Sequence, residues 1–121
     1  MTVLDHVGIY VKDMERSLAF YVDVFGFSEH RKLNRGETKI VFLDIGKGLL
    51  ELVQRPDAPG EPPKGRWSHL ALQTEDFDEL LSKIVEMGLE HRTSTRGEGS
   101  RRAFFKDPDG HDLEINEKPF D

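Results

Sequence analysis

The chain has 121 residues, of which 36% are hydrophobic and 33% are charged, and it contains no cysteine. This length and composition suit one soluble domain with a modest core, and the lack of cysteine excludes disulfides, thiolate metal ligands and a catalytic thiol. The net charge of −6 argues against nucleic acid and anionic lipid as partners. No apolar run is long enough to span a membrane, and no secretory leader is recognisable, so we expect a cytoplasmic protein.

The first half of the chain is predicted to form a βαβββ module. Residues 4–11 alternate in polarity and are rich in β-branched side chains, which is typical of a strand. Asp13 is a good N-cap for the helix that follows, and Gly26 is a good stop signal. The predicted elements are a strand over 4–11, a helix over 16–25, and strands over 28–33, 38–45 and 49–54.

The second half is predicted to repeat this order. Asp76 is the expected N-cap of its helix, and the run from Asp107 to Gly110 has good turn chemistry. His111, in the same turn, is expected at the surface. The predicted elements are a strand over 67–74, a helix from 76 to about 87, and strands over 90–95, 102–106 and 112–116. Residues 55–65 hold four of the six prolines, so we expect an extended linker between modules 1–54 and 66–121.

The two halves match at one constant offset in the sequence. His6 aligns with His69 and Glu51 with Glu114, each at an offset of 63 residues, and Phe42 aligns with Phe105 at the same offset. The flanking apolar positions alternate in register as well. This pattern predicts a tandem duplication and an α+β fold of two βαβββ modules, whose strands form a curved mixed sheet around a metal-binding cavity.

The two histidines and two glutamates are the candidate metal ligands: His6, Glu51, His69 and Glu114. Each His lies in the first strand of its half and each Glu in the last strand. Glu51 and Glu114 stand among leucine and isoleucine neighbours, where a buried carboxylate requires a cation or a donor. Two imidazoles and two carboxylates suit one Zn, Ni, Co, Fe or Mn ion, with open positions of the kind found in catalytic sites.

A simpler interpretation is that each His is half-buried and each Glu faces solvent from an edge strand. For any one residue alone we favour this simpler interpretation. For four residues related by a repeat we favour the metal.

These residues resemble the vicinal oxygen chelate superfamily, which includes glyoxalase I, fosfomycin resistance proteins, bleomycin-binding proteins and extradiol dioxygenases. The motifs that carry the resemblance are Asp5-His6-Val7-Gly8, Ser17-Leu18-Ala19-Phe20-Tyr21, Ser68-His69-Leu70-Ala71 and Phe105-Lys106-Asp107-Pro108-Asp109-Gly110 with Leu113-Glu114. They cover nearly the whole chain, and they identify the superfamily rather than one member.

The order His, Glu, His, Glu is most similar to bacterial glyoxalase I. That resemblance implies a lyase or isomerase acting on an α-carbonyl substrate, with methylglyoxal-thiol hemithioacetal as one candidate, by proton transfer through a metal-bound enediolate. It implies that Glu114 is the catalytic base and Glu51 its partner across the metal. Tyr10 and Arg55 replace an Arg and an Asn that help to hold glutathione in that family, so the thiol cosubstrate stays open.

Two other members of the superfamily remain alternatives. Residues 97–100 with Arg101 and Arg102 resemble the fosfomycin-resistance thiol transferases, although those enzymes lack an acid at the position of Glu51. A surface-exposed strand start explains the two arginines equally well. A drug-binding module of the same superfamily is the remaining alternative. In all three cases the partner is a small molecule, and we expect a homodimer.

Overall fold

The computed structural model describes residues 4–58, 69–97 and 99–119. The chain divides into two compact units, Met1–Gly60 and Glu61–Asp121. Each unit contains one helix and one four-stranded mixed sheet. The α+β class and the tandem βαβββ order expected from the sequence are therefore confirmed.

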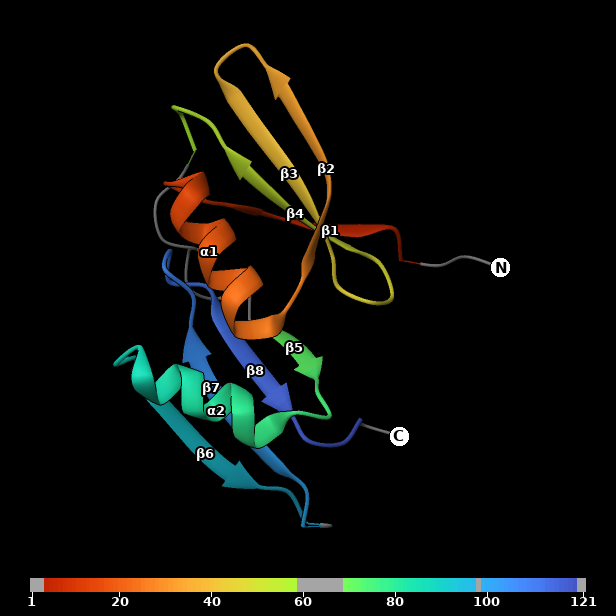
Figure 1. Cartoon of the computed structure of the whole chain (residues 1–121), viewed down its shortest axis with the longest axis vertical. Coiled ribbons are helices and arrows are strands. Elements are labelled where there is room, and N and C mark those ends of the chain that lie inside the picture. The colour runs from red at the N-terminus through yellow and green to blue at the C-terminus, as the bar shows by residue number, and fades with distance from the viewer. Residues whose placement is uncertain (1–3, 59–68, 98, 120–121) are drawn as a thin grey trace. The chain divides into compact units, whose positions relative to one another are not determined.

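Unit 1 forms its sheet in the strand order β1-β4-β3-β2. Strands β1 and β4 are parallel, and the other two pairs are antiparallel. Figure 1 shows α1 beside this sheet, between β1 and β2 in the chain. The elements are β1 (His6–Tyr10), α1 (Met14–Phe25), β2 (Ser28–Arg35), β3 (Thr38–Asp44) and β4 (Leu49–Gln54).

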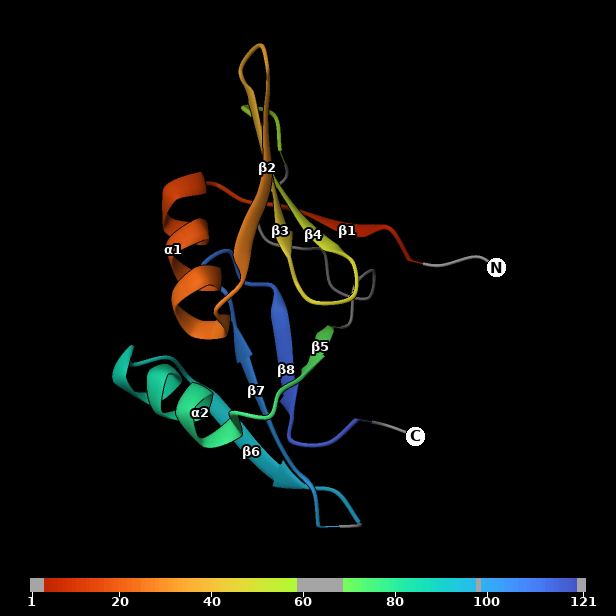
Figure 2. The ribbon, with the colours of Figure 1, turned by 45° about the vertical axis from the view of Figure 1, so that its right-hand side comes forward.

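Unit 2 has the same topology, with the strand order β5-β8-β7-β6 and one parallel pair, β5 with β8. Helix α2 lies along one face of this sheet in both views of the ribbon (Figures 1 and 2). The elements are β5 (Leu70–Gln73), α2 (Phe77–Glu86), β6 (His91–Thr95), β7 (Arg101–Lys106) and β8 (Asp112–Asn116).

Helix α1 begins and ends where the sequence predicts. The Asp13 side chain accepts a hydrogen bond from the Arg16 amide at 3.0 Å, which satisfies one of the free N–H groups of the first turn. Gly26 adopts a φ of 71°, the left-handed conformation that glycine reaches without strain, and ends the helix. Helix α2 also begins after its predicted cap, Asp76, but this side chain makes no capping hydrogen bond.

Strand alternation separates the core from the face that carries the glutamates. In β4, Leu50 and Leu52 are fully buried on either side of Glu51, and in β8 Leu113 and Ile115 are buried on either side of Glu114. Successive side chains of a strand point to opposite faces. In both units the apolar neighbours of the glutamate therefore lie in the core, and the glutamate lies on the other face of the sheet. The helix residues buried with these strands are Met14, Phe20, Tyr21 and Val24 in α1 and Phe77, Leu80 and Ile84 in α2.

Several strand bounds differ from the predicted ones by a few residues. Strand β2 extends to Arg35, because it pairs with β3 up to the turn at Gly36, whose φ is 62°. Strand β1 is shorter than predicted, at His6–Tyr10, and β5 covers only Leu70–Gln73 of the predicted 67–74. Residues 67 and 68, and residues 59–65 of the predicted linker, lie outside the described part of the chain.

The expectation that His111 lies at the surface is wrong, since this residue is only 8% exposed. The turn before it is the predicted one, with the Gly110 amide donating to the Asp107 carbonyl at 3.1 Å. The Asp107 carboxylate accepts hydrogen bonds from the amides of Asp109 at 2.9 Å and His111 at 2.8 Å. These bonds anchor the turn at the start of β8, where His111 becomes buried.

The repeat does not keep one offset through the last two strands. Phe42 pairs with Glu51 across β3 and β4, whereas Glu114 pairs with Phe104, and Phe105 pairs with Leu113. The turn between β7 and β8 is one residue longer than the turn between β3 and β4. Because a shift of one residue moves a side chain to the other face of a strand, the counterpart of Phe42 is Phe104, and the sequence match with Phe105 is a structural mismatch.

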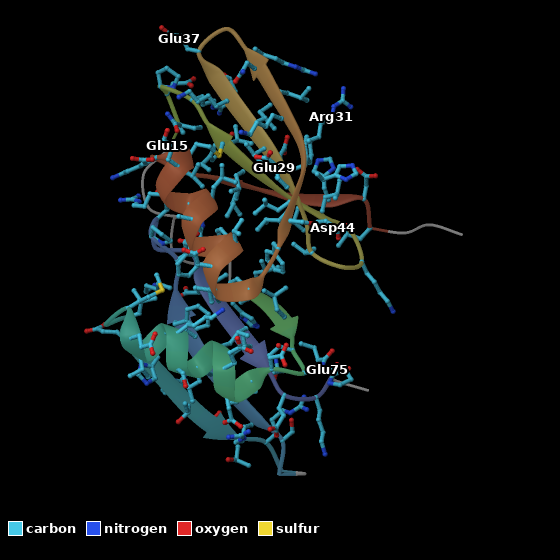
Figure 3. The ribbon with its side chains drawn as sticks, in the orientation of Figure 1. Glu15, Glu29, Arg31, Glu37, Asp44 and Glu75 are labelled. Carbon is cyan, nitrogen blue, oxygen red and sulfur yellow. The ribbon has the colours of Figure 1, made fainter. Side chains whose placement is uncertain are left out.

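The charged residues of the described ranges lie largely outside the two cores. Glu15, at the start of α1, and Glu37, in the turn between β2 and β3, project outward from the ribbon in Figure 3, and both are exposed. Neither α1 nor α2, the two helices of the described residues, has the length and apolar character that a bilayer span requires.

Candidate metal centre

The first candidate pair, His6 and Glu51, comes from two adjacent parallel strands of unit 1. In the register of β1 and β4, Glu51 lies opposite Gly8, two residues beyond His6 on the same face. The Nε2 atom of His6 is 3.8 Å from Oε1 of Glu51, and the two side chains are 40% and 21% exposed. The strand pairing therefore brings together two of the four predicted ligands.

Gly8 provides the space that the Glu51 carboxylate occupies. A Cβ atom added at position 8 would lie 2.8 Å from Oε1 of Glu51, which is too close for a carbon–oxygen contact. Any other residue would displace the carboxylate. A glycine inside a strand is unfavourable for strand stability and often marks such a close approach. We did not identify this role from the sequence, although a glycine two residues after a candidate histidine is a usable signal.

The His6 ring is oriented by its neighbours. Its Nδ1 lies 2.6 Å from Oδ2 of Asp5, and Phe42 contacts the ring edge-on at a centroid distance of 5.4 Å. The hydrogen bond with Asp5 raises the pKa of His6, and it outweighs the lowering by burial, while the charge of Glu51 adds to the rise. A carboxylate bonded to Nδ1 leaves Nε2 available as a ligand, an arrangement common around metal-bound histidines.

The second candidate pair, His69 and Glu114, has the same geometry in unit 2. The His69 Nε2 is 3.5 Å from Oε1 of Glu114. Glu114 is only 4% exposed, and its Oε2 accepts a hydrogen bond from Nδ2 of Asn116 at 2.6 Å. Asn116 therefore holds one carboxylate oxygen and leaves the other facing the imidazole. Asn116 lies two residues after Glu114 on β8 and shares its face, but the sequence gave no indication of this contact.

The donor set and its spacing fit a divalent metal ion. Two donors on one ion, each at about 2.1 Å, lie about 3.0 to 3.8 Å apart for bond angles of about 90 to 130 degrees. Both imidazole–carboxylate separations are within this range and are longer than a direct hydrogen bond. Within neither unit do the described residues include three His, Asp or Glu side chains close enough to hold a metal. Within each unit, the described residues thus bring together two candidate ligands.

A cavity of about 440 Å³ in unit 1 includes Glu51 in its lining. This volume is sufficient for a small molecule. The cavity extends along the sheet face from Glu51 past Val53 to Arg55, whose guanidinium lies 4.6 Å from the centre of the Tyr10 ring and whose Nε lies 3.3 Å from Asp57. The lining of this cavity therefore combines charged and polar side chains with apolar ones.

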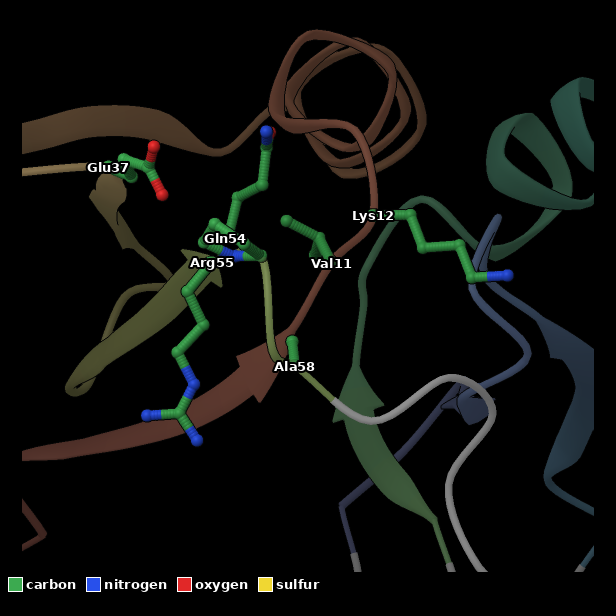
Figure 4. Close-up of a pocket in the computed structure, with 7 residues that line it drawn as sticks. Val11, Lys12, Glu37, Gln54, Arg55 and Ala58 are labelled. Atoms are coloured by element: carbon green, nitrogen blue, oxygen red, sulfur yellow. The ribbon is translucent and has the colours of Figure 1, made fainter.

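A second hollow in unit 1, of about 340 Å³, lies at the end of β4 (Figure 4). Val11, Gln54 and Arg55 contribute to its lining, and Figure 4 shows the Arg55 side chain extending away from Glu37. Neither His6 nor Glu51 lines this hollow. We assign no chemistry to it.

The two arginines at the start of β7 have different surroundings. Arg101 binds Asp78 at 2.8 Å and Glu117 at 2.6 Å, and its guanidinium lies 4.8 Å from the centre of the Phe77 ring. These hydrogen bonds lower the pKa of both acids. Arg102 instead donates to the Ser94 hydroxyl at 2.9 Å and lies on the Glu114 face, as alternation predicts. Only Arg102 is placed to serve the candidate centre.

Comparisons with known proteins identify the family. The family model described as the glyoxalase/bleomycin resistance protein/dioxygenase superfamily matches residues 3–115. The chain is 32% identical to the metallothiol transferase FosB of Lysinibacillus sphaericus (strain C3-41), covering 96% of this chain and 84% of that one. It is 29% identical to the lactoylglutathione lyase GLX1 of Arabidopsis thaliana, covering 91% of this chain but only 42% of that one.

Solved structures show the same fold. The crystal structure of SMU.1112c matches with a TM-score of 0.80 and 27% sequence identity, covering 97% of this chain and 99% of that one. The family match, the two βαβββ units and the paired histidines and glutamates agree with one another. The chain belongs to the glyoxalase/bleomycin resistance protein/dioxygenase superfamily.

Proposed function

We propose that the chain is a metal-dependent lyase or isomerase of the glyoxalase I type, acting on a small α-carbonyl compound. Its metal would be held by His6 and Glu51 from one unit and by His69 and Glu114 from the other. The observation that supports this proposal is the repeated pairing of an imidazole Nε2 with a carboxylate Oε1, at 3.8 Å and 3.5 Å. The 29% identity to a lactoylglutathione lyase supports it further.

A divalent ion bound by these residues would polarise the substrate carbonyl and stabilise the negative charge that develops on its oxygen. The carboxylate of Glu114 would remove the proton from the hydroxyl-bearing carbon next to the carbonyl and return it to the carbonyl carbon. The hydroxyl proton would pass to the former carbonyl oxygen, so the product is an isomer of the substrate. Asn116, through its 2.6 Å hydrogen bond, would keep Oε2 fixed while Oε1 acts. Glu51 would serve as the second carboxylate ligand of the ion.

The proposal is tested first by metal analysis. Wild-type protein should bind one divalent ion per chain, and Glu51→Gln should bind it more weakly, because the substitution removes an anionic ligand. After reloading with nickel or zinc, the wild type should convert methylglyoxal in the presence of a thiol. Protein that binds no divalent metal at micromolar concentrations would overturn the proposal. One ion per chain without turnover would support the metal site and indicate that the substrate is a different α-carbonyl compound.

The two histidine–glutamate pairs that hold one metal could come from the same chain or from two chains of a dimer. We propose a homodimer in which His6 and Glu51 of one chain join His69 and Glu114 of the other. Glu51→Gln and Glu114→Gln homodimers, mixed and allowed to exchange, would then form heterodimers with one intact and one doubly altered site. Activity should reappear in the mixture. If the pairs instead meet within one chain, both chains stay altered and mixing restores nothing.

A thiol transferase of the fosfomycin-resistance type is the second candidate, because the chain is 32% identical to a metallothiol transferase over nearly its whole length. Glu51 argues against this assignment, since that branch uses two histidines and one glutamate. Expression in a fosfomycin-sensitive bacterium separates the two candidates. Protection that requires Glu114 but tolerates Glu51→Gln would favour the transferase, and lack of protection would remove it.

A further inference from the structure

Two arginines flank one aromatic ring on the sheet face of unit 2 that carries Glu114. In the strand pairing, Glu114 of β8 lies opposite Phe104 of β7, and Phe104 lies opposite Arg92 of β6. Arg102 lies two residues before Phe104 on β7, opposite Asn116. Directly paired residues share a face of the sheet. Glu114, Asn116, Phe104, Arg92 and Arg102 therefore form one continuous surface.

The Phe104 ring holds both guanidinium groups in place. The Cζ atoms of Arg92 and Arg102 lie 4.5 Å and 5.2 Å from the ring centre. Contact with an aromatic face favours a cation at this distance. It does not neutralise the charge, so two like charges remain close together on one ring.

Neither arginine has a carboxylate partner among the residues that the structure describes. Arg102 donates to the neutral hydroxyl of Ser94, and Arg92 forms no ion pair with another residue in the described ranges. The neighbouring cations of the same sheet are different: Arg101 binds Asp78 and Glu117, and Lys106 binds Asp112 at 2.8 Å. In a chain of net charge −6, a pair of cations without acidic partners beside a candidate metal ligand stands out.

Arg92 and Phe104 also line a cavity of about 610 Å³. The cavity continues past Lys106 to the turn before β6. The lining also includes the acids Glu90, Asp107 and Asp112, and Arg92 is the arginine that it contains. Arg102 contacts the same Phe104 ring without lining the cavity. Guanidinium groups bind carboxylate, phosphate and phosphonate oxygens through paired hydrogen bonds.

We propose that Arg92 and Arg102 form an oxyanion subsite beside Glu114, so that the substrate of this centre carries a carboxylate or phosphorus oxyanion in addition to its carbonyl group. The assignment of the oxyanion to a substrate rests on the proposed function. The binding of an oxyanion to the two arginines does not. Because an apolar ring alone would favour a hydrophobic substituent, the two cations are the feature that sets this preference.

The test uses the full-length protein, as purified and after treatment with a chelator, titrated with inorganic phosphate and separately with acetate. Nitrogen-15 NMR of the arginine side chains reports binding. The Nε–H signals of Arg92 and Arg102 should shift with saturation, with and without chelator, and the tighter of the two probes identifies the class of oxyanion.

Matched variants locate the site. Arg92→Gln and Arg102→Gln should each weaken binding by about tenfold or more, Arg92→Gln more strongly because only Arg92 of the two lines the cavity. Arg92→Lys should retain part of the affinity. Lys47→Gln, which removes one positive charge from a turn in unit 1, should leave binding unchanged, and an unchanged amide spectrum shows that each variant is folded.

Three results would overturn the subsite: no saturable shift of either arginine, a loss of affinity in Lys47→Gln equal to that in Arg92→Gln, or phosphate binding that vanishes with chelator and ignores both arginine substitutions. The proposed function is judged separately. Metal binding and hemithioacetal turnover without oxyanion binding would remove the subsite alone, and oxyanion binding by protein that takes up no metal would remove the catalytic proposal alone.

Discussion

The two units have the same topology but position their histidine–glutamate pairs differently: unit 1 holds the histidine, and unit 2 holds the glutamate. In unit 1 the imidazole is held, by Asp5 at 2.6 Å, while Glu51 is 21% exposed beside the space left by Gly8. In unit 2 the carboxylate is held, since Glu114 is buried and bonded to Asn116 at 2.6 Å. The two repeated modules therefore keep the same candidate ligands, while the residues that position them differ.

Among the substitutions that test this difference between the units, those of the two glutamates should have the largest effect. Glu114→Gln should lower kcat by about a thousandfold, within the range expected when a general base is removed, because we propose its buried carboxylate as the base. Glu51→Gln should mainly weaken metal binding and retain more turnover at saturating metal. Steady-state kinetics at several metal concentrations separates the two effects. Equal losses of kcat in both variants would contradict the assignment, and Glu29→Gln on β2 serves as the charge-matched control.

A smaller but sharper effect is expected at Gly8. Gly8→Ala places a Cβ 2.8 Å from Oε1 of Glu51 and should displace the carboxylate, with a loss of metal affinity of about 10- to 100-fold. Its counterpart in unit 2 is Ala71, which lies opposite Glu114 and already carries a Cβ. Ala71→Gly should therefore leave affinity nearly unchanged. Competition with a fluorescent chelator measures both, and equal affinities for the two variants would show that Gly8 has no role in positioning Glu51.

The residues that hold the pairs should have intermediate effects. Asn116→Ala removes the donor to Oε2 of Glu114, and Asp5→Asn weakens the bond to Nδ1 of His6; losses of metal affinity of about tenfold are expected for such supporting contacts. Asn116→Ala should also lower kcat, because Glu114 is the proposed base, whereas Asp5→Asn should not. Metal titration and kinetics on the same samples test this. A fall in kcat for Asp5→Asn alone would reverse the roles assigned to the two units.

The smallest effect concerns stability. Arg101 lowers the pKa values of Asp78 and Glu117 below their ordinary values of 3.8 and 4.5. A lowered carboxyl pKa adds stability that is present above the ordinary value and is lost as the pH falls through the lowered value. Arg101→Gln should therefore reduce the melting temperature by a few degrees at pH 7, and the difference from wild type should shrink below about pH 4.5. A difference that persists at pH 2 would assign the effect to the Phe77 contact instead.

The sequence predicted those parts of the fold that local pattern determines. Strands β4 and β8 match their predicted bounds, because a single glutamate within a run of leucine and isoleucine residues leaves little choice of register. The start and end of α1 follow from Asp13 and Gly26 for equally local reasons. The pairing of each histidine with its glutamate was implicit in the repeat.

The parts that the sequence did not predict depend on pairing between strands. The contact of Arg92 with Phe104 requires the register of β6 against β7, which no local pattern specifies. The Asn116–Glu114 bond depends on a side-chain rotamer, and the burial of His111 on the hydrogen bonds of Asp107. Alignment at a constant offset also missed the extra residue in the turn between β7 and β8.

That extra residue has a consequence for anyone who exchanges parts between the two halves. A chimera that transplants the hairpin of β7 and β8 into the place of β3 and β4, cut at positions 63 residues apart, would align Phe105 with Phe42. If the turn were then trimmed to the native length of unit 1, the aromatic ring that belongs in the core would turn toward the glutamate, and Phe104 would be forced inward. The hairpins are interchangeable only as whole pieces, each with its own turn.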